Sequence, residues 1–102
     1  MNFDRCSKIQ KHDRYLQRLK DELRDKYDFL YTNIKLTTKK RTKSEIDLMG
    51  IRGSHVDIYE VKCSFRITKA RHQLKKIRRM LNLADMSTYF YCGSTRQIQL
   101  VL

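Results

Sequence analysis

At 102 residues the chain is long enough for one domain with a single modest core and too short for two. Lysine and arginine outnumber aspartate and glutamate by 23 to 11, which gives a formal charge of +12. This charge favours a polyanionic partner, with nucleic acid ahead of an anionic membrane.

Several protein classes are excluded by what the sequence lacks. No run approaches the roughly 18 apolar residues needed to span a bilayer, and the first residues contain no apolar signal-peptide core. We therefore expect an intracellular, cytoplasmic location (host cytoplasm if a virus or plasmid encodes the chain) and no membrane partner. Cys6, Cys63 and Cys92 show no CxxC spacing and are expected to be reduced thiols rather than a disulfide framework or a zinc or iron-sulfur set.

Periodicity divides the chain into seven elements. The pattern predicts helices over residues 7–26 and 68–84, and strands over residues 27–36, 45–51, 55–63, 87–92 and 96–101. The first helix is indicated by apolar residues at helical spacing: Ile9, Leu16, Leu19 and Leu23. The expected order is therefore α-β-β-β-α-β-β within one domain spanning residues 1–102.

Charged residues interrupt the apolar strands around "RGS", where the sequence predicts a hairpin turn in which Gly53 tolerates a positive φ. With the turn centred between Gly53 and Ser54, antiparallel partners have numbers that sum to 107, so Asp47 faces Glu60. Strand alternation puts Glu60 and Lys62 on one face and Asp57 on the other. A shift of one residue would move Asp47 to the wrong face.

Two carboxylates this close repel each other unless a cation lies between them. Lys62 supplies part of that charge, and Mg²⁺ or Mn²⁺, which prefer carboxylate oxygens, would supply more. In so basic a chain the implied reaction is hydrolysis of a nucleic-acid phosphodiester. The plainer alternative is that Glu45 pairs with Lys62, and Asp47 with an arginine, as ordinary surface ion pairs.

"EIDL" at 45–48 followed by "YEVKC" at 59–63 resembles the PD-(D/E)xK nuclease superfamily, in particular archaeal Holliday junction resolvases and small resolvase-like endonucleases. The resemblance implies a restriction-endonuclease-like α/β (α+β) core with a mixed central sheet flanked by two helices. It also implies that Asp47 and Glu60 bind the metal with help from the Val61 carbonyl, and that Lys62 is catalytic. One departure is Ile46, where the family usually has proline.

Both helices offer further candidates. His12 lies in the middle of the inward stripe of the first helix and Asp13 at its edge, and either is a candidate to complete the metal site or orient a water. Gln73 lies on the inward face of the second helix, between Ala70 and Ile77, and is a candidate catalytic residue. The plainer alternatives are a core histidine with satisfied hydrogen bonds and a glutamine bonded to backbone.

The basic residues are unevenly spread, and two segments that are rich in them flank this site. No acid occurs between Val61 and Ala84, and a basic loop precedes the acidic strand. We expect nine residues of these segments to bind nucleic acid by contacting its phosphates. They are Lys39, Lys40, Arg41, Lys43, Arg66, Lys69, Arg71, Lys75 and Lys76. The alternative is a solvated cationic face.

The leading hypothesis is a Mg²⁺- or Mn²⁺-dependent DNA endonuclease, with a structure-selective enzyme such as a junction resolvase as one form. A second hypothesis is a nuclease-fold protein that binds nucleic acid without cutting it, and a third is an interaction module for a protein or membrane partner. A resolvase must cut two strands symmetrically, so the first hypothesis carries the expectation of a homodimer.

Overall fold

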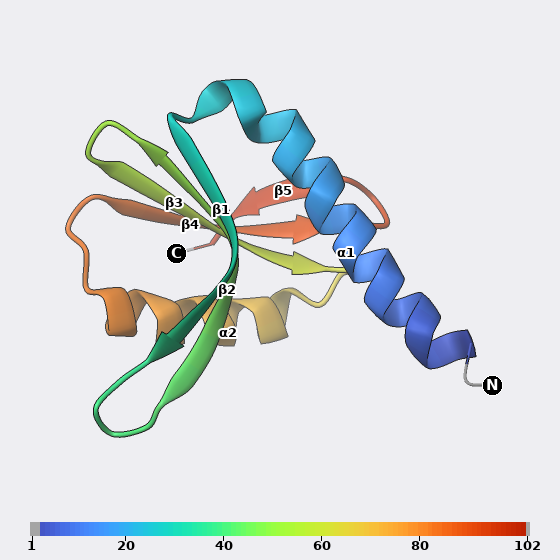
Figure 1. Ribbon diagram of the computed structural model, residues 1–102, viewed down its shortest axis with the longest axis horizontal. Helices are drawn as coiled ribbons and strands as arrows, with labels where there is room; N and C mark the ends of the chain where they lie inside the picture. The colour runs from blue at the N-terminus through green and yellow to red at the C-terminus, as the bar shows by residue number, and fades with distance from the viewer. Residues whose placement is uncertain (1–2, 102) are drawn as a thin grey trace.

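The computed structural model describes the backbone of residues 3–101 and the side chains of residues 10–101. It contains two α-helices, one 3-10 helix and five strands (Figure 1). Their bounds are α1 Phe3–Leu23, the 3-10 helix Arg24–Lys26, β1 Phe29–Thr37, β2 Lys43–Arg52, β3 His55–Lys62, α2 Ile67–Leu81, β4 Met86–Cys92 and β5 Gln97–Leu100. The expected order is matched loosely, since α1 begins four residues earlier than expected and ends in a separate 3-10 turn.

The five strands form one mixed sheet in the order β1-β2-β3-β4-β5. Neighbouring strands are antiparallel except β3 and β4, which are parallel. Helix α2 makes the crossover between these two parallel strands, as a connection of that kind requires. The expected α+β class with a mixed sheet and two helices is confirmed.

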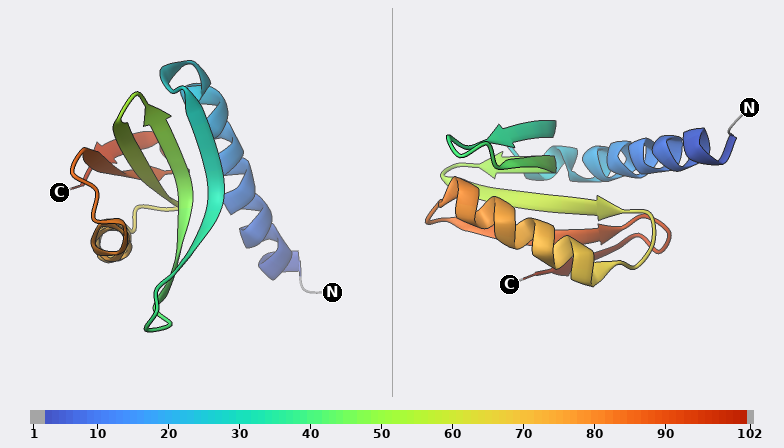
Figure 2. Two further views of the ribbon diagram at one scale, coloured as in Figure 1. Left: turned by 60° about the vertical axis from the view of Figure 1, so that its left-hand side comes forward. Right: turned by 90° about the horizontal axis from the view of Figure 1, so that it is seen from below.

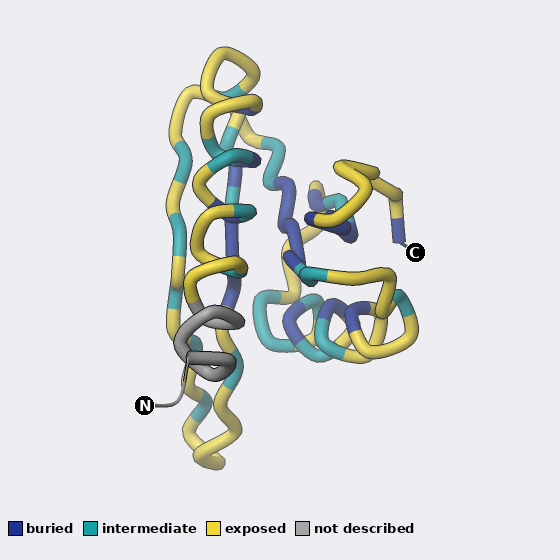
Figure 3. Tube along the Cα trace, turned by 90° about the vertical axis from the view of Figure 1, so that its right-hand side faces the viewer, coloured by how far each residue is buried: buried dark blue, intermediate teal, exposed yellow. Residues whose placement is uncertain are grey.

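The helices cover opposite faces of the sheet (Figure 2), and each covers its own apolar cluster. Under α1 the buried residues are Leu16, Leu19, Leu23, Leu48, Tyr59, Val61 and Tyr91. Under α2 they are Ile46, Ile58, Ala70, Leu74, Ile77, Met86, Phe90, Cys92 and Val101. Burial is concentrated in the central strands and the inward helix faces, whereas the β1 edge is more exposed (Figure 3). The two-sided core explains why β3 is almost continuously buried.

The hairpin register agrees with the expectation. Arg52 pairs with His55 and Leu48 with Tyr59, so partner numbers sum to 107. Gly53 has a φ of 60°, which a side chain would make unfavourable. The β2-β3 ladder ends at Leu48 and Tyr59, so Asp47 and Glu60 are the first residues past its end.

The apolar side chains of hairpin β1-β2 change from one face of the sheet to the other half-way along the hairpin. Leu30 and Leu48 pack under α1, whereas Ile34 and Ile46, which strict alternation would place on the same face, pack under α2. The pairing omits Asn33 and Asp47, which would face each other, and Asn33 has a φ of 55°. A local distortion of the backbone therefore lies at Asp47, and the simple alternation assumed from the sequence does not hold for β2.

Cys63 and Cys92 are free thiols, as expected. The side chains of Cys6 and Ile9 lie outside the described residues. No helix in the described part of the chain is long and apolar enough to cross a membrane.

Candidate active site

Asp47 lies where β2 and β3 separate, and its carboxylate spans the gap between them. The backbone N–H of Val61 donates a 2.8 Å hydrogen bond to Asp47 Oδ2. The side chain of Asp47 thus accepts the hydrogen bond that a backbone carbonyl of β2 would accept if the strands were still paired. The aspartate is buried, with 8% of its surface exposed. Its position depends both on the hairpin register and on the distortion opposite Asn33.

Glu60 is the more deeply buried of the two acids, at 3% exposure. Its Oε1 lies 3.5 Å from Lys62 Nζ, and its Oε2 is buried without a hydrogen-bond partner among the described residues. Burial and the negative charge of Asp47 raise the pKa of Glu60 to about 8, although Lys62 acts in the opposite direction. A buried carboxyl oxygen without a partner is costly, and Lys62 satisfies only the Oε1 side of Glu60.

His12 approaches the same point from α1. Its Nε2 lies 3.0 Å from the Val61 carbonyl oxygen and 3.6 Å from Asp47 Oδ2. The neighbouring carboxylate of Asp47 raises the pKa of His12, against the effect of its partial burial. Burial alone would raise the pKa of Asp47, but His12 and the Val61 N–H hold it below its ordinary value. The pairing therefore favours the charged forms of both His12 and Asp47.

The converging oxygens fit a hard divalent cation. Two carboxylates and the Val61 carbonyl are the donors that Mg²⁺ or Mn²⁺ prefers, and the unpaired Glu60 Oε2 is a buried acceptor with no internal partner. Within residues 10–101 there is no group of three or more His, Cys, Asp or Glu side chains placed to hold a metal. Asp47, Glu60 and the Val61 carbonyl could therefore supply only part of a cation's coordination, and waters would have to complete it.

The two remaining candidates from the helices have different positions. Asp13 is exposed, and it makes no hydrogen bond or ion pair within the described part of the chain. The expectation that it binds the metal is not supported by its position, because the residue after inward-facing His12 is turned about 100° around the helix. Gln73 lies on the sheet-facing side of α2, and its Oε1 is buried without a partner. Helix α2 covers the face on which Glu60 lies, so Gln73 remains a candidate.

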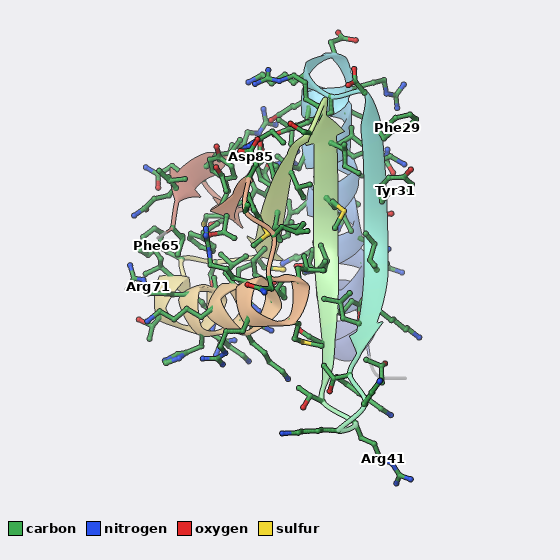
Figure 4. All side chains as sticks on the ribbon, turned by 90° about the vertical axis from the view of Figure 1, so that its left-hand side faces the viewer. Phe29, Tyr31, Arg41, Phe65, Arg71 and Asp85 are labelled. Atoms are coloured by element: carbon green, nitrogen blue, oxygen red, sulfur yellow. The ribbon has the colours of Figure 1, made fainter. Side chains whose placement is uncertain are left out.

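The basic residues divide into separate groups. Lys39, Lys40 and Arg41 form the β1-β2 loop and Lys43 begins β2. Arg66 and Lys69 line a cavity of about 460 Å³ at the start of α2. Lys75, Lys76 and Arg71 lie further along α2, and Arg71 points to solvent (Figure 4).

A second polar network was missed in the sequence. The Tyr27 hydroxyl donates to Asp57 Oδ2 at 2.6 Å and lies 2.6 Å from the Tyr59 hydroxyl. His55 connects Asp57 Oδ1, at 2.7 Å, to Asp85, at 2.5 Å. Asp57 belongs to this network and not to the site of Glu60, as strand alternation indicated. The sequence signal for this network is the spacing of His55 and Asp57, which lie two residues apart on β3 and therefore share a face.

Neither a scan against protein-family models nor a search of the curated proteins finds a match for this chain.

Proposed function

We propose that this protein is a Mg²⁺- or Mn²⁺-dependent endonuclease that hydrolyses phosphodiester bonds in DNA. The observation that carries the proposal is the convergence of Asp47, Glu60 and the Val61 carbonyl where β2 and β3 separate. Glu60 Oε2 is left buried and unpaired there. A strongly cationic chain supplies the complement to a polyanionic substrate.

The arrangement of the sheet supports a nuclease fold of the PD-(D/E)xK type. The acid and the E-x-K sequence lie on consecutive antiparallel strands, and β3 is followed by a helix and a parallel strand. These are the features that the resemblance in the sequence implies. The proposal of a restriction-endonuclease-like core rests on this agreement together with the motif.

Each residue of the cluster has a role that its position allows. Asp47 and Glu60 would hold the cation with the Val61 carbonyl, and the bound cation would activate a water and stabilise charge on the phosphate. Lys62 presents an ammonium beside Glu60 that can meet the negative charge developing on the phosphoryl oxygens. His12, hydrogen-bonded at Val61, holds the carbonyl and Asp47 in position from α1. In the reaction the water oxygen bonds to phosphorus, one ester P–O bond breaks, and the departing oxygen takes up a proton.

A second candidate is a DNA-binding protein on the same fold that does not cut. The observation in its favour is that the cluster contains its own cations: His12 lies beside Asp47, and Lys62 beside Glu60. In that case the two basic side chains neutralise the acids, and no metal is needed for a stable fold. Binding to DNA that persists in EDTA, with no cleavage of any substrate, is the expected behaviour.

The decisive experiment is a cleavage panel over duplex, flap, single-stranded and four-way DNA with Mg²⁺ and Mn²⁺. Asp47→Ala, Glu60→Ala and Lys62→Ala are expected to lose about 100-fold or more of the cleavage rate, because each removes a group from the reacting site. Glu45→Ala is the matched control, since Glu45 is an exposed carboxylate two residues from Asp47. Circular dichroism checks the fold of each variant.

Metal binding has a readout independent of activity. Mg²⁺ or Mn²⁺ is expected to raise the melting temperature of the wild-type protein and of Glu45→Ala, but not of Glu60→Ala. Full cleavage activity in all three site variants would sink the endonuclease proposal. Metal-independent melting, combined with DNA binding and no cleavage, would favour the second candidate.

A homodimer remains part of the proposal for a junction-selective enzyme, which needs two sites related by a twofold axis. Strand β5 ends the sheet, and Ile98 and Leu100 on it are exposed. Light scattering of the wild-type protein measures the oligomeric state. A monomer at high concentration would remove the dimer from the proposal without affecting the assignment of the cluster.

A further inference from the structure

A basic cleft lies between the β1-β2 loop and the second half of α2. Its volume is about 680 Å³, and it is lined by Thr38, Lys39, Lys40, Thr42, Lys76, Arg79 and Met80. Four of these seven residues are cations and none is an acid. In Figure 4 nitrogen-tipped side chains extend from α2 and from the tip of the hairpin, where Arg41 is labelled and points away.

The walls of the cleft are held in place by hydrogen bonds. Lys76 Nζ donates to the carbonyl oxygen of Lys43 at 2.5 Å, which joins α2 to the start of β2. The loop is closed on itself, because Thr38 N–H donates to the Thr42 carbonyl at 3.0 Å and the Thr42 N–H to Thr38 Oγ1 at 3.1 Å. Lys39 and Lys40 therefore project from an ordered turn, which reduces the entropy lost when they bind an anion.

The cations of the cleft have no internal counter-charge. Among residues 10–101, no carboxylate lies within ion-pair distance of Lys39, Lys40, Lys76 or Arg79. Four like charges around one hollow repel each other, and an external anion that bridges them would relieve that repulsion. Phosphates spaced along a backbone meet several of these cations at once, and each contact releases a condensed counterion.

We infer that this cleft binds the phosphate backbone of the nucleic-acid strand that is cut at the carboxylate cluster; this inference rests on the proposed function. Lys43, whose carbonyl oxygen accepts a hydrogen bond from Lys76 in the cleft, lies four residues from Asp47 on β2, which corresponds to about 13 Å of extended strand. One strand of duplex advances about 3.4 Å per nucleotide. The cleft therefore meets the backbone roughly four nucleotides from the scissile phosphate, and the substrate is a strand that continues at least that far on one side.

The test is a binding measurement in EDTA, so that cleavage plays no part. Fluorescence anisotropy is measured with labelled DNA oligonucleotides lengthened one nucleotide at a time, at several salt concentrations. The cleft variant combines Lys40→Glu with Arg79→Glu, both at exposed positions, and leaves Lys76 to hold the helix. The control combines Arg24→Glu with Arg96→Glu, which makes the same change in net charge at exposed positions outside both basic groups.

The cleft variant is expected to bind long oligonucleotides about tenfold more weakly than the control near physiological salt, and to lose about two units of salt slope. The difference between the two variants should vanish for oligonucleotides too short to reach the cleft. Equal losses in both variants, or a loss that does not depend on length, would overturn the inference. So would a polyglutamate peptide that binds as tightly as DNA and responds in the same way to the cleft substitutions.

This outcome is separable from that of the proposed function. If the cleft variant behaves as expected but the wild-type protein cuts no substrate, the endonuclease proposal fails and the cleft remains a nucleic-acid site. If the wild-type protein cuts DNA and the cleft variant binds like the control, the cleft fails and the endonuclease proposal stands.

Discussion

Asp57 and Glu60 lie three residues apart on β3 and face opposite sides of the sheet, and both are buried. Asp57 accepts hydrogen bonds on both oxygens, from Tyr27 at 2.6 Å and from His55 at 2.7 Å. Glu60 has only Lys62 at 3.5 Å, and its second oxygen has no partner among the described residues. The first carboxylate completes an internal network, whereas the second has an oxygen that no described residue satisfies.

The surroundings of Asp57 are shaped to complete that network. Gly50 pairs with Asp57 across the sheet, and a Cβ at Gly50 would lie 2.7 Å from the Tyr27 ring. The missing side chain gives Tyr27 room to cross β2 and reach the aspartate. Near Glu60 the strands separate instead, so no cross-strand neighbour satisfies it. Burial alone therefore does not distinguish Asp57 from Glu60; the unpaired oxygen of Glu60 does.

The largest effect that separates the two acids is expected in catalysis. Glu60→Gln keeps the shape of the side chain but removes its charge, so we expect the cleavage rate to fall about 100-fold or more. Asp57→Asn makes the same chemical change on the same strand and should cleave at close to the wild-type rate below its melting temperature. Both rates are measured on the best substrate of the cleavage panel. Equal losses of cleavage rate in the two variants would show that Glu60 has no catalytic role that Asp57 lacks.

Substitutions at the Asp57 network are expected to lower stability more than substitutions at Glu60, the reverse of their order in catalysis. Tyr27→Phe removes the donor to Asp57 and a partner of Tyr59, and should lower the free energy of unfolding by about 1–3 kcal/mol. Glu60→Gln replaces a buried carboxyl that lacks a full set of partners with a neutral amide, and should leave the free energy of unfolding unchanged or raised. Chemical denaturation measures both. A larger loss in Glu60→Gln than in Tyr27→Phe would contradict the assignment of Glu60 as the unsatisfied acid.

The two regions should also differ in how stability depends on pH. The folded state raises the pKa of Glu60 from 4.5 to about 8. The stability that comes from its proton is thus fully present below pH 4.5 and is lost as the pH rises to about 8. Bonds to Asp85 and Asp57 raise the pKa of His55 above 6.5, so its contribution is present below pH 6.5 and is lost above it.

Melting temperatures over this pH range separate the two contributions. The wild-type protein should lose stability between pH 4.5 and about 8, and Glu60→Gln should not show the share of this loss that comes from Glu60. His55→Gln should not show the share of the loss above pH 6.5 that comes from His55. A profile for Glu60→Gln that is parallel to that of the wild-type protein would mean that Glu60 is ionised in the folded state throughout.

Most of the fold follows from short-range patterns in the sequence. The turn at Gly53 determined the hairpin register, and the register brought Asp47 next to Glu60. Helical spacing identified the buried Leu16, Leu19 and Leu23 of α1 and the buried Ala70, Leu74 and Ile77 of α2. The predicted end of the second helix at residue 84 is wrong, because α2 ends at Leu81, where Asn82 takes a left-handed conformation, and Ala84 is exposed. The side chain of Ile9 is outside the described residues. These features depend on local geometry that repeats with a fixed period, which is why a single sequence reveals them.

The details of both polar sites depend on long-range contacts and were harder to predict. Tyr27 and Asp57 are brought together through the gap at Gly50, and nothing in the local pattern indicates such a contact. Alternation predicted that Asp47 shares a face with Glu60, but the faces of β2 exchange at Asp47. Asn33 causes no break in the apolar pattern of β1, so the sequence does not reveal the backbone distortion opposite Asp47.

The smallest expected effect concerns Asn33, which we assign as a positioning residue for Asp47. Its φ of 55° is tolerated by asparagine and by glycine but costs about 1 kcal/mol for alanine. Asn33→Ala should therefore relax the distortion, turn Asp47 away from the Val61 N–H, and slow cleavage by several-fold. Asn33→Gly keeps the backbone conformation accessible and should restore the rate.

Arg96 provides a matched control for Asn33, because it has a φ of 62° in the β4-β5 turn, a connection that carries none of the proposed site residues. Arg96→Ala is expected to lose a similar amount of stability and to cleave at the wild-type rate. Thermal unfolding and single-turnover kinetics on the same samples separate the two effects. If Asn33→Ala cleaves as fast as Arg96→Ala, the face exchange in β1-β2 serves only the packing under α2, and Asp47 owes its orientation to His12 and the Val61 N–H alone.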